Sequence, residues 1–145
     1  MTVIIDIDDT LSLAGERFKL ATKPDGKINW DIAHDPELVK KDKPNLPMVD
    51  LAKRYKKAGF KVVILTGRPD TIRTTTEEWL DNYGIEYDEL YMRNKKEHYL
   101  KADVFKKRIY EIYLNDVFCA YDDDERIIQM WNSVGIPAFK VYPIQ

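Results

Sequence analysis

Residues 3–11 of the chain read Val3-Ile4-Ile5-Asp6-Ile7-Asp8-Asp9-Thr10-Leu11, so an apolar run leads directly into three carboxylates and a hydroxyl. The apolar residues do not alternate with polar ones, which is typical of a strand buried on both faces of a parallel sheet. Asp6 and Asp8 are two positions apart, and on an extended strand their side chains point the same way. Clustered carboxylates at the end of a buried strand repel one another and lose hydration, so they indicate a compensating cation. Mg2+ fits best, because it takes oxygen ligands and keeps positions open for phosphate.

The length and composition indicate one ordinary globular unit. The chain has 145 residues, enough for a single compact domain over residues 1–145. A single cysteine, Cys119, excludes an internal disulfide framework and favours a reducing, cytoplasmic compartment. We expect neither a membrane-spanning segment nor a secretory signal. The formal net charge of −2 argues against a general nucleic-acid coat protein, which would usually be basic.

Hydrophobic patterning alternates between two periods along the rest of the chain. Apolar strands are predicted at 60–65, 89–92, 117–121 and 138–142, and amphipathic helices at 45–58, 70–83, 102–114 and 125–134. This alternation predicts an α/β fold of three layers, with a mainly parallel, five-stranded, Rossmann-like sheet. Acidic residues end both the first and the fourth strand, so these strands must be neighbours if the acids act together. The resulting order is 5-4-1-2-3, with the switch point between strands 1 and 4, where ligands bind in such sheets.

The segment 12–43 interrupts this pattern directly after the first strand. It is rich in charge, carries the turn signal Pro24-Asp25-Gly26-Lys27, and contains Arg17, Phe18, Trp30 and His34. We predict a flap or small cap over the sheet edge, with a short hairpin around Asp25-Gly26. Loops on a rigid scaffold commonly carry specificity, so this segment is the expected source of substrate selection.

Polar side chains gather where the predicted strands end. The candidates are Asp6 and Asp8 after strand 1, Thr66, Gly67 and Arg68 after strand 2, a lysine of the third helix, and Asp122 and Asp123 after strand 4. A metal bridging Asp6 and either Asp122 or Asp123 would neutralise phosphoryl oxygens, and the Thr66 hydroxyl would donate to them. A lysine ammonium would balance the remaining negative charge. The sequence therefore predicts phosphoryl chemistry at this edge of the sheet.

The series Asp-x-Asp-x-Thr, then Thr66, then a helix lysine, then Asp122-Asp123, resembles the haloacid dehalogenase (HAD) superfamily of phosphotransferases. The resemblance implies that Asp6 is a nucleophile that becomes an aspartyl-phosphate, and that Asp8 is the general acid and base. It also implies Mg2+ as the cofactor. The implied metal ligands are Asp6, Asp8, Asp122 and Asp123.

The chain is also similar, over nearly its whole length, to the 3′-phosphatase domain of bacteriophage polynucleotide kinase/phosphatase. The similarity rests on six stretches: Asp6 to Leu11, Arg17, Pro47-Met48-Val49, Leu65-Thr66-Gly67-Arg68, Lys101 to Lys106, and Asp122 to Trp131. It implies that Arg17, Thr66, Gly67 and Arg68 bind the substrate phosphate region and that Lys106 is the motif lysine, with Lys101 as the competing assignment. The chain departs from that family at two places. Asp9 stands where the family usually has Gly, and the acidic residues before the helix lysine are fewer here, with Ala102 beside Asp103. The chain has no phosphate-binding Gly-x-x-x-x-Gly-Lys-Ser/Thr stretch, so it contains no kinase half.

Several functions remain open at this point. The first is a Mg2+-dependent polynucleotide 3′-phosphatase, for which Phe18 and Trp30 could stack on a base, although either could simply pack the cap. The serious rivals are a 5′- or 3′-nucleotidase and another small-molecule phosphatase of the same superfamily. A phospho-receiver signalling domain also uses Asp, Thr and Lys around a metal. Receivers carry the phosphoacceptor on an internal strand, after an acidic pair on the first strand, whereas here the paired acids recur on strand 4. A catalytically silent binding module is disfavoured because Asp6 and Asp8 are both present.

Overall fold

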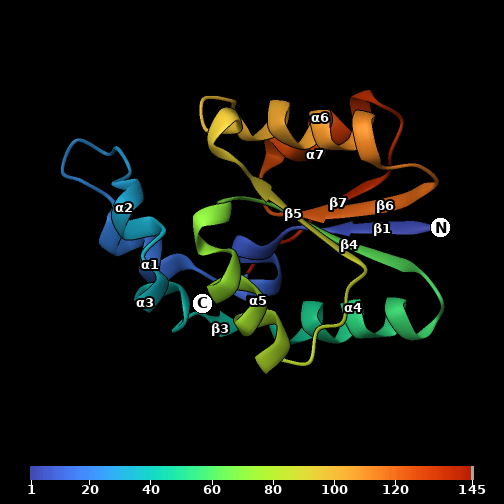
Figure 1. Ribbon diagram of the computed structural model, residues 1–145, viewed down its shortest axis with the longest axis horizontal. Coiled ribbons are helices and arrows are strands. Elements are labelled where there is room, and N and C mark those ends of the chain that lie inside the picture. Colours follow the sequence, from blue (N-terminus) through green and yellow to red (C-terminus); the bar gives the residue numbers. More distant parts are fainter. Residues whose placement is uncertain (145) are drawn as a thin grey trace.

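The computed structural model describes residues 1–144 and places a five-stranded sheet at the centre of the molecule (Figure 1). The strands lie in the order β5-β4-β1-β6-β7, and every neighbouring pair is parallel. Their bounds are β1 Thr2–Ile5, β4 Lys61–Pro69, β5 Glu89–Arg93, β6 Val117–Asp122 and β7 Ala138–Lys140. Counted along the chain, these are the third, second, first, fourth and fifth sheet strands. The predicted α/β class and strand order are therefore confirmed.

Two layers of helix cover the sheet. Helices α4 (Leu46–Lys57) and α5 (Arg73–Asn82) pack on one face, and α6 (Ala102–Tyr113) and α7 (Glu125–Ser133) on the other (Figure 1). The apolar run of β1 serves both layers, because Val3 and Ile5 join the core under α4 and α5 while Ile4 joins the core under α6 and α7. Full burial of each such side chain contributes about 1.5–3 kcal/mol, which makes the sheet edge a stable platform for a site.

The segment between β1 and α4 is mostly helical. It contains β2 (Ser12–Leu13), α1 (Gly15–Ala21), α2 (Trp30–Ala33), α3 (Pro36–Val39) and β3 (Lys43–Pro44), and β2 pairs with β3 in antiparallel fashion. A turn does form at residues 24–26, closed by a single bridge between Thr22 and Ile28. The expected hairpin is therefore reduced to one bridge. In Figure 1, α1 and α2 project from the body of the molecule beside the carboxyl ends of the sheet strands.

The chain leaves the sheet earlier than the sequence pattern indicates. β1 ends at Ile5, Asp6 is still extended, and Ile7–Leu11 forms one irregular π-type turn in which Asp9 has a φ of 58°. The prediction that Asp6 and Asp8 share one face of an extended strand is therefore wrong. Asp8 belongs to the turn, so its carboxylate can approach a different set of partners.

The connections that follow β4, β5 and β6 are short. Two 3-10 turns, Asp70–Ile72 and Lys95–Glu97, come after β4 and β5, and the Asp124 side chain caps the N-terminus of α7 by accepting from the Arg126 N–H. None of the helices in residues 1–144 has the length and apolar character needed to cross a membrane.

Candidate active site

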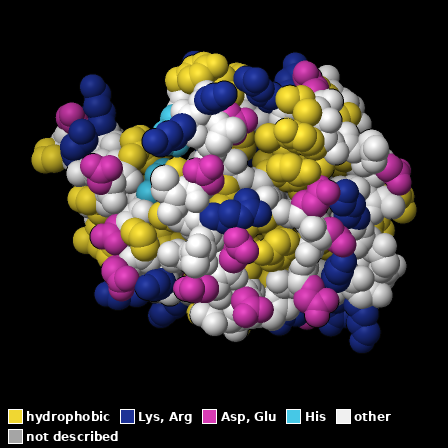
Figure 2. All heavy atoms as spheres, viewed as in Figure 1, with side chains coloured by type: hydrophobic (Ala, Val, Ile, Leu, Met, Phe, Trp, Pro, Cys, Tyr) yellow, Lys and Arg dark blue, Asp and Glu magenta, His cyan; other side chains and the backbone are white. Residues whose placement is uncertain are grey.

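A cleft of about 1060 Å3 lies over the carboxyl ends of β1, β4 and β6. Figure 2 shows it as a hollow between the lobe of residues 15–39 and the body of the molecule, with histidine side chains along it. The sheet supplies its floor, the α1–α2 lobe one wall, and the segment between β5 and α6 the other. The cleft therefore occupies the edge of the sheet predicted to hold a ligand.

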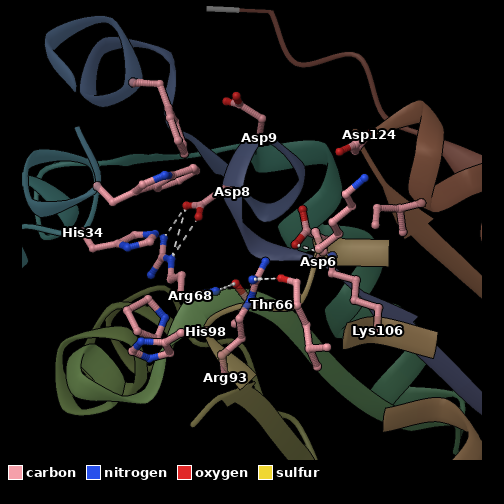
Figure 3. A pocket seen from close by; sticks show the side chains of 18 of the residues that line it. Asp6, Asp8, Asp9, His34, Thr66, Arg68, Arg93, His98, Lys106 and Asp124 are labelled. Atoms are coloured by element: carbon pink, nitrogen blue, oxygen red, sulfur yellow. Dashed lines mark hydrogen bonds and ion pairs between the residues drawn. The ribbon is translucent and has the colours of Figure 1, made fainter. Parts of the chain in front are cut away.

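One side of the floor is a buried group of carboxylates around a lysine (Figure 3). Lys106 Nζ donates to Asp6 Oδ1 at 3.0 Å and to Asp122 Oδ2 at 2.6 Å. The other Asp6 oxygen accepts from the Thr10 hydroxyl at 3.2 Å. Asp123 completes the group, since ligand oxygens of Asp6, Asp122 and Asp123 all lie within 4.8 Å of one another. The residue after β1, a lysine of α6 and the acidic pair at the end of β6 thus meet at one point.

The charges of this group are not balanced by protein residues alone. Burial, and then the charge of Asp122, raises the pKa of Asp6 to about 7, against the lowering effect of Lys106. Burial, with the charges of Asp6 and Asp122, raises the pKa of Asp123 to about 9. Three carboxylate ligands with one lysine between them form a donor set that suits a hard divalent cation such as Mg2+. The residues that would hold it are Asp6, Asp122 and Asp123.

The two candidate lysines lie in different environments. Lys106 is 4% exposed and bonded to both Asp6 and Asp122, whereas Lys101 is exposed at the N-terminal end of α6. Burial alone would lower the pKa of Lys106, but the charges of Asp122 and Asp6 raise it above its usual value, so the ammonium stays charged. This geometry favours Lys106 over Lys101 as the motif lysine.

We expect Lys106→Met to lower kcat by about 100- to 1000-fold, because it removes the donor that holds Asp6 and offsets its charge. Lys101→Met, the same change at a cleft-lining lysine, should retain most of the activity. Phosphate release under saturating substrate would measure both, with circular dichroism to check the fold. Equal losses in the two variants would contradict the assignment of Lys106.

Asp8 lies on the other side of the floor, where Figure 3 shows it beside Arg68. Its carboxylate accepts from Arg68 Nη2 at 2.7 Å and from Arg17 Nη2 at 2.5 Å. Arg17 also donates to Asp42 through Nε at 3.2 Å and Nη2 at 2.8 Å, and to the Ala33 carbonyl of α2. Burial alone would raise the pKa of Asp8, but Arg68 and Arg17 hold it well below its usual range. Asp8 is therefore a carboxylate in this structure.

The geometry of this network bears on the predicted roles of three residues, which remain predictions. Asp8 is outside the group of Asp6, Asp122 and Asp123, so its side chain is not placed to ligate the same cation. Arg17 is 3% exposed and its guanidinium is occupied by Asp8, Asp42 and Ala33, so the geometry does not support direct substrate binding by this residue. Arg68 lines the cleft but is 1% exposed and bonded to Asp8 and Thr76. Both arginines donate hydrogen bonds to the Asp8 carboxylate.

Asp42 is a site residue that the sequence pattern missed. It is 6% exposed, it pairs with Arg17, and its backbone carbonyl accepts from the Trp79 indole N–H at 2.9 Å. In the sequence it stands within Lys40-Lys41-Asp42-Lys43, which is typical of a solvated loop. No spacing marks it, because its partner Arg17 lies 25 residues earlier.

We expect Asp42→Asn to destabilise the protein by about 3 kcal/mol, because it leaves Arg17 with one buried charge partner fewer. It should also lower kcat by about 10- to 100-fold through misplacement of Asp8. Urea unfolding and phosphate release would measure the two effects. Asp50→Asn breaks the exposed ion pair with Arg54 and is the matched control, with almost no change expected in either quantity. A fully active and stable Asp42→Asn protein would contradict the positioning role.

The last residues of β4 bring backbone and hydroxyl groups to the same cleft, so Thr66, Gly67 and Arg68 belong to this strand, past its register shift after Leu65, and do not follow it as predicted. Thr66 is 1% exposed, and its hydroxyl accepts from the Arg68 N–H at 3.2 Å. A side chain at Gly67 would press on Arg93, since a Cβ built there would lie 3.0 Å from Arg93 Nη2. Both residues line the cleft, as the sequence predicted for substrate contacts.

The wall formed by the α1–α2 lobe is aromatic. Phe18, Trp30 and His34 line the cleft, with Trp30 stacked on His34 at 5.2 Å between ring centroids and edge-on to Phe18 at 6.4 Å. Trp30 is 56% exposed. Burial lowers the pKa of His34 to about 4, so this ring is neutral near pH 7.

Comparison with known proteins agrees with this geometry. A family model described as the polynucleotide kinase PNKP phosphatase domain matches residues 1–144. The chain is 30% identical to a chain in the "Structure of Pnkp1/Rnl/Hen1 complex" and to one in the "Structure of the Pnkp1/Rnl/Hen1 RNA repair complex", with TM-scores of 0.78 and 0.80. Those matches cover 99% of this chain but only 47% and 43% of the other chains, so it spans less than half of their length.

A more distant match shows the fold alone. The "Crystal structure of a predicted phosphatase from Clostridium acetobutylicum" is 14% identical, with a TM-score of 0.72, over 96% of this chain and 83% of that one. Together, the site geometry and the family model show that the chain belongs to the HAD-type phosphatase family represented by the polynucleotide kinase PNKP phosphatase domain.

Proposed function

We propose that this protein is a Mg2+-dependent phosphomonoesterase that removes 3′-phosphates from nucleic-acid ends through an aspartyl-phosphate on Asp6. The observation that carries the proposal is the Asp6 carboxylate, which is held at the floor of the cleft by Lys106 and Thr10 and lies beside Asp122 and Asp123. A positioned carboxylate next to a cation site is the arrangement that nucleophilic attack on phosphorus requires.

In the first half-reaction, an Asp6 oxygen attacks the phosphorus and the bond from phosphorus to the 3′-oxygen breaks. A proton on Asp8 goes to the leaving oxygen. In the second half-reaction, the Asp8 carboxylate takes a proton from water, whose oxygen attacks the aspartyl-phosphate to give inorganic phosphate and free Asp6. Lys106 stays bonded to Asp6 and Asp122 and offsets their charge. Mg2+ bound by Asp6, Asp122 and Asp123 would supply further charge neutralisation at the phosphoryl oxygens.

The state of Asp8 fits the second half-reaction directly, since Arg17 and Arg68 keep it ionised and oriented. For the first half-reaction its pKa must rise when substrate binds. A phosphate group that enters the cleft brings negative charge close to Asp8, and a nearby negative charge raises the pKa of a carboxylate.

The aromatic wall supports a nucleic-acid substrate. An exposed Trp30 backed by a neutral His34 offers a flat face on which a base can stack, and such stacking contributes about 1–3 kcal/mol per base. The relatives in the Pnkp1/Rnl/Hen1 structures, one of which is called an RNA repair complex, support the same substrate class. The rival is a nucleotidase, because the cleft is also large enough for a mononucleotide.

A matched substrate panel tests the proposal. We expect kcat/KM to be highest for an oligonucleotide with a 3′-phosphate, lower for a nucleoside 3′-phosphate, and lowest for the same oligonucleotide with a 5′-phosphate and for a sugar phosphate. Because a polymer makes extra backbone contacts, its KM should rise steeply with salt, whereas that of nitrophenyl phosphate should change little.

Trp30→Ala separates recognition from chemistry within this panel. It should raise KM for the oligonucleotide about tenfold and leave nitrophenyl phosphate hydrolysis unchanged. Sugar phosphates turned over as well as every nucleotide tested would exclude the nucleic-acid substrate and leave a general phosphatase. Mononucleotides that match oligonucleotides at low salt would identify a nucleotidase.

A further inference from the structure

Arg93, the last residue of β5, is a cleft-lining arginine that lacks the carboxylate partners of the other two arginines near the floor. Arg17 pairs with Asp8 and Asp42, and Arg68 pairs with Asp8. Among residues 1–144, the described hydrogen bonds of Arg93 are limited to Nη1 donating to the Leu100 carbonyl at 2.6 Å. Its Nε is the sole buried side-chain nitrogen or oxygen of this part of the chain without a hydrogen-bond partner.

The surroundings hold this guanidinium in place without neutralising it. It lies over the Phe105 ring, with 5.5 Å between Cζ and the ring centroid, and against Gly67, whose added Cβ would come within 3.0 Å of Nη2. Burial lowers the pKa of Arg93, and the charge of Glu97 only partly offsets this. The Glu97 carboxylate is engaged elsewhere, since it accepts from the Asn94 N–H. A partly buried cation without a paired anion is unfavourable unless a ligand completes it.

The position of Arg93 indicates what that ligand is. Figure 3 shows the side chain rising into the cleft beside Thr66, between the sides on which Asp6 and Asp8 lie. Arginine presents a planar fork of N–H donors that matches phosphate oxygens. In Arg93, Nη1 donates to the Leu100 carbonyl, and Nη2 is the donor that a phosphate would meet. Resting on the proposed phosphatase function, we propose that Arg93 forms a phosphate-binding site for the substrate, together with the Thr66-Gly67 segment of β4.

Two phosphates of a polynucleotide substrate could occupy this site: the 3′-terminal phosphate that reacts and the internucleotide phosphate next to it. Both present the same chemistry to a guanidinium. Inorganic phosphate and nitrophenyl phosphate contain only the first kind, whereas a 3′-phosphorylated oligonucleotide contains both. Comparison of these probes therefore identifies which phosphate Arg93 binds.

The test compares Arg93→Met with wild type and with Arg54→Met, which makes the same change at an exposed arginine of α4. Calorimetric titration with inorganic phosphate in the presence of Mg2+ gives a dissociation constant that does not depend on turnover. If the reacting phosphate is bound, Arg93→Met should raise this constant and lower kcat/KM for nitrophenyl phosphate, each by about 10- to 100-fold. If the internucleotide phosphate is bound, only KM for the oligonucleotide should rise by that factor. Arg54→Met should match wild type throughout.

A structural role for Arg93 predicts a different outcome. Removal of an uncompensated cation should leave the thermal midpoint of the phosphate-free protein unchanged or higher, so a lower midpoint with unaltered phosphate affinity and oligonucleotide KM overturns the proposal.

If Arg93→Met does not fold, Arg93→Lys, which keeps the charge but loses the fork, is measured in the same way. If wild type hydrolyses no nucleic acid, the proposed function fails. A phosphate dissociation constant raised by Arg93→Met then still supports a phosphate site at Arg93, and an unchanged constant overturns it. If oligonucleotides are hydrolysed and Arg93→Met changes neither the phosphate dissociation constant nor KM for the oligonucleotide, only this inference fails.

Discussion

Asp6→Asn is expected to abolish phosphate release while leaving the fold intact. An amide oxygen is a poor nucleophile, so the aspartyl-phosphate cannot form, and loss of a nucleophile of this kind reduces kcat by more than about 10⁴-fold. The substitution is isosteric and removes one of three crowded carboxylates, so the thermal midpoint should not fall. The measurement is phosphate release from nitrophenyl phosphate and from a 3′-phosphorylated oligonucleotide, with unfolding followed by circular dichroism.

Asp9→Asn is the matched control, because Asp9 is the third acid of the same stretch and has no role in the proposed chemistry. Its Oδ1 accepts from the Ala14 N–H at 2.8 Å, which an asparagine can reproduce, and its φ of 58° is a conformation that asparagine tolerates. This variant should retain most of the activity. Substantial turnover by folded Asp6→Asn would mean that another group attacks phosphorus.

Removal of divalent metal should have an effect of similar size. Asp6, Asp122 and Asp123 place three carboxylates around one lysine, and their mutual repulsion requires a further positive charge before an anionic phosphate can approach. We expect excess chelator to reduce turnover to background, and added Mg2+ to restore it. Initial rates against free Mg2+ concentration would measure the requirement.

Two neighbouring substitutions locate the metal. Asp123→Asn should increase the Mg2+ concentration needed for half-maximal rate, because it removes one proposed ligand. Asp124→Asn lies in the same turn, and asparagine caps a helix as well as aspartate does, so its Mg2+ requirement should equal that of wild type. Full activity in excess chelator would remove the metal from the mechanism altogether.

Much of the fold could be predicted because its signals are local. The apolar run of residues 3–5 has no polar alternation, α4 to α7 each extend for nine residues or more, and acids follow both β1 and β6. Those features determine the class and the strand order. The helices α2 and α3 escaped prediction because each spans only four residues, which is too short for a hydrophobic period to register.

The candidate site was less predictable because its pairings join distant parts of the chain. The sequence points to Asp6, Lys106, Asp122 and Asp123 through their places at strand ends and on a helix. It could not indicate that Asp8 turns away from Asp6, since the chain leaves the strand in the irregular turn of Ile7–Leu11. Nor could it indicate that Arg17 meets Asp42, because both belong to a charged segment where most side chains are solvated.

The close approach of Gly67 to Arg93 has an evolutionary consequence. A methyl group at position 67 would press on Nη2, and Arg93 cannot easily yield, because it is anchored to the Leu100 carbonyl and packed on Phe105. Substitutions at the two positions are therefore epistatic and have a preferred order. A lineage can replace Arg93 first and then accept alanine at position 67, but the reverse order passes through an impaired intermediate. Among homologues, a side chain at position 67 should occur only where the arginine at position 93 has already been lost.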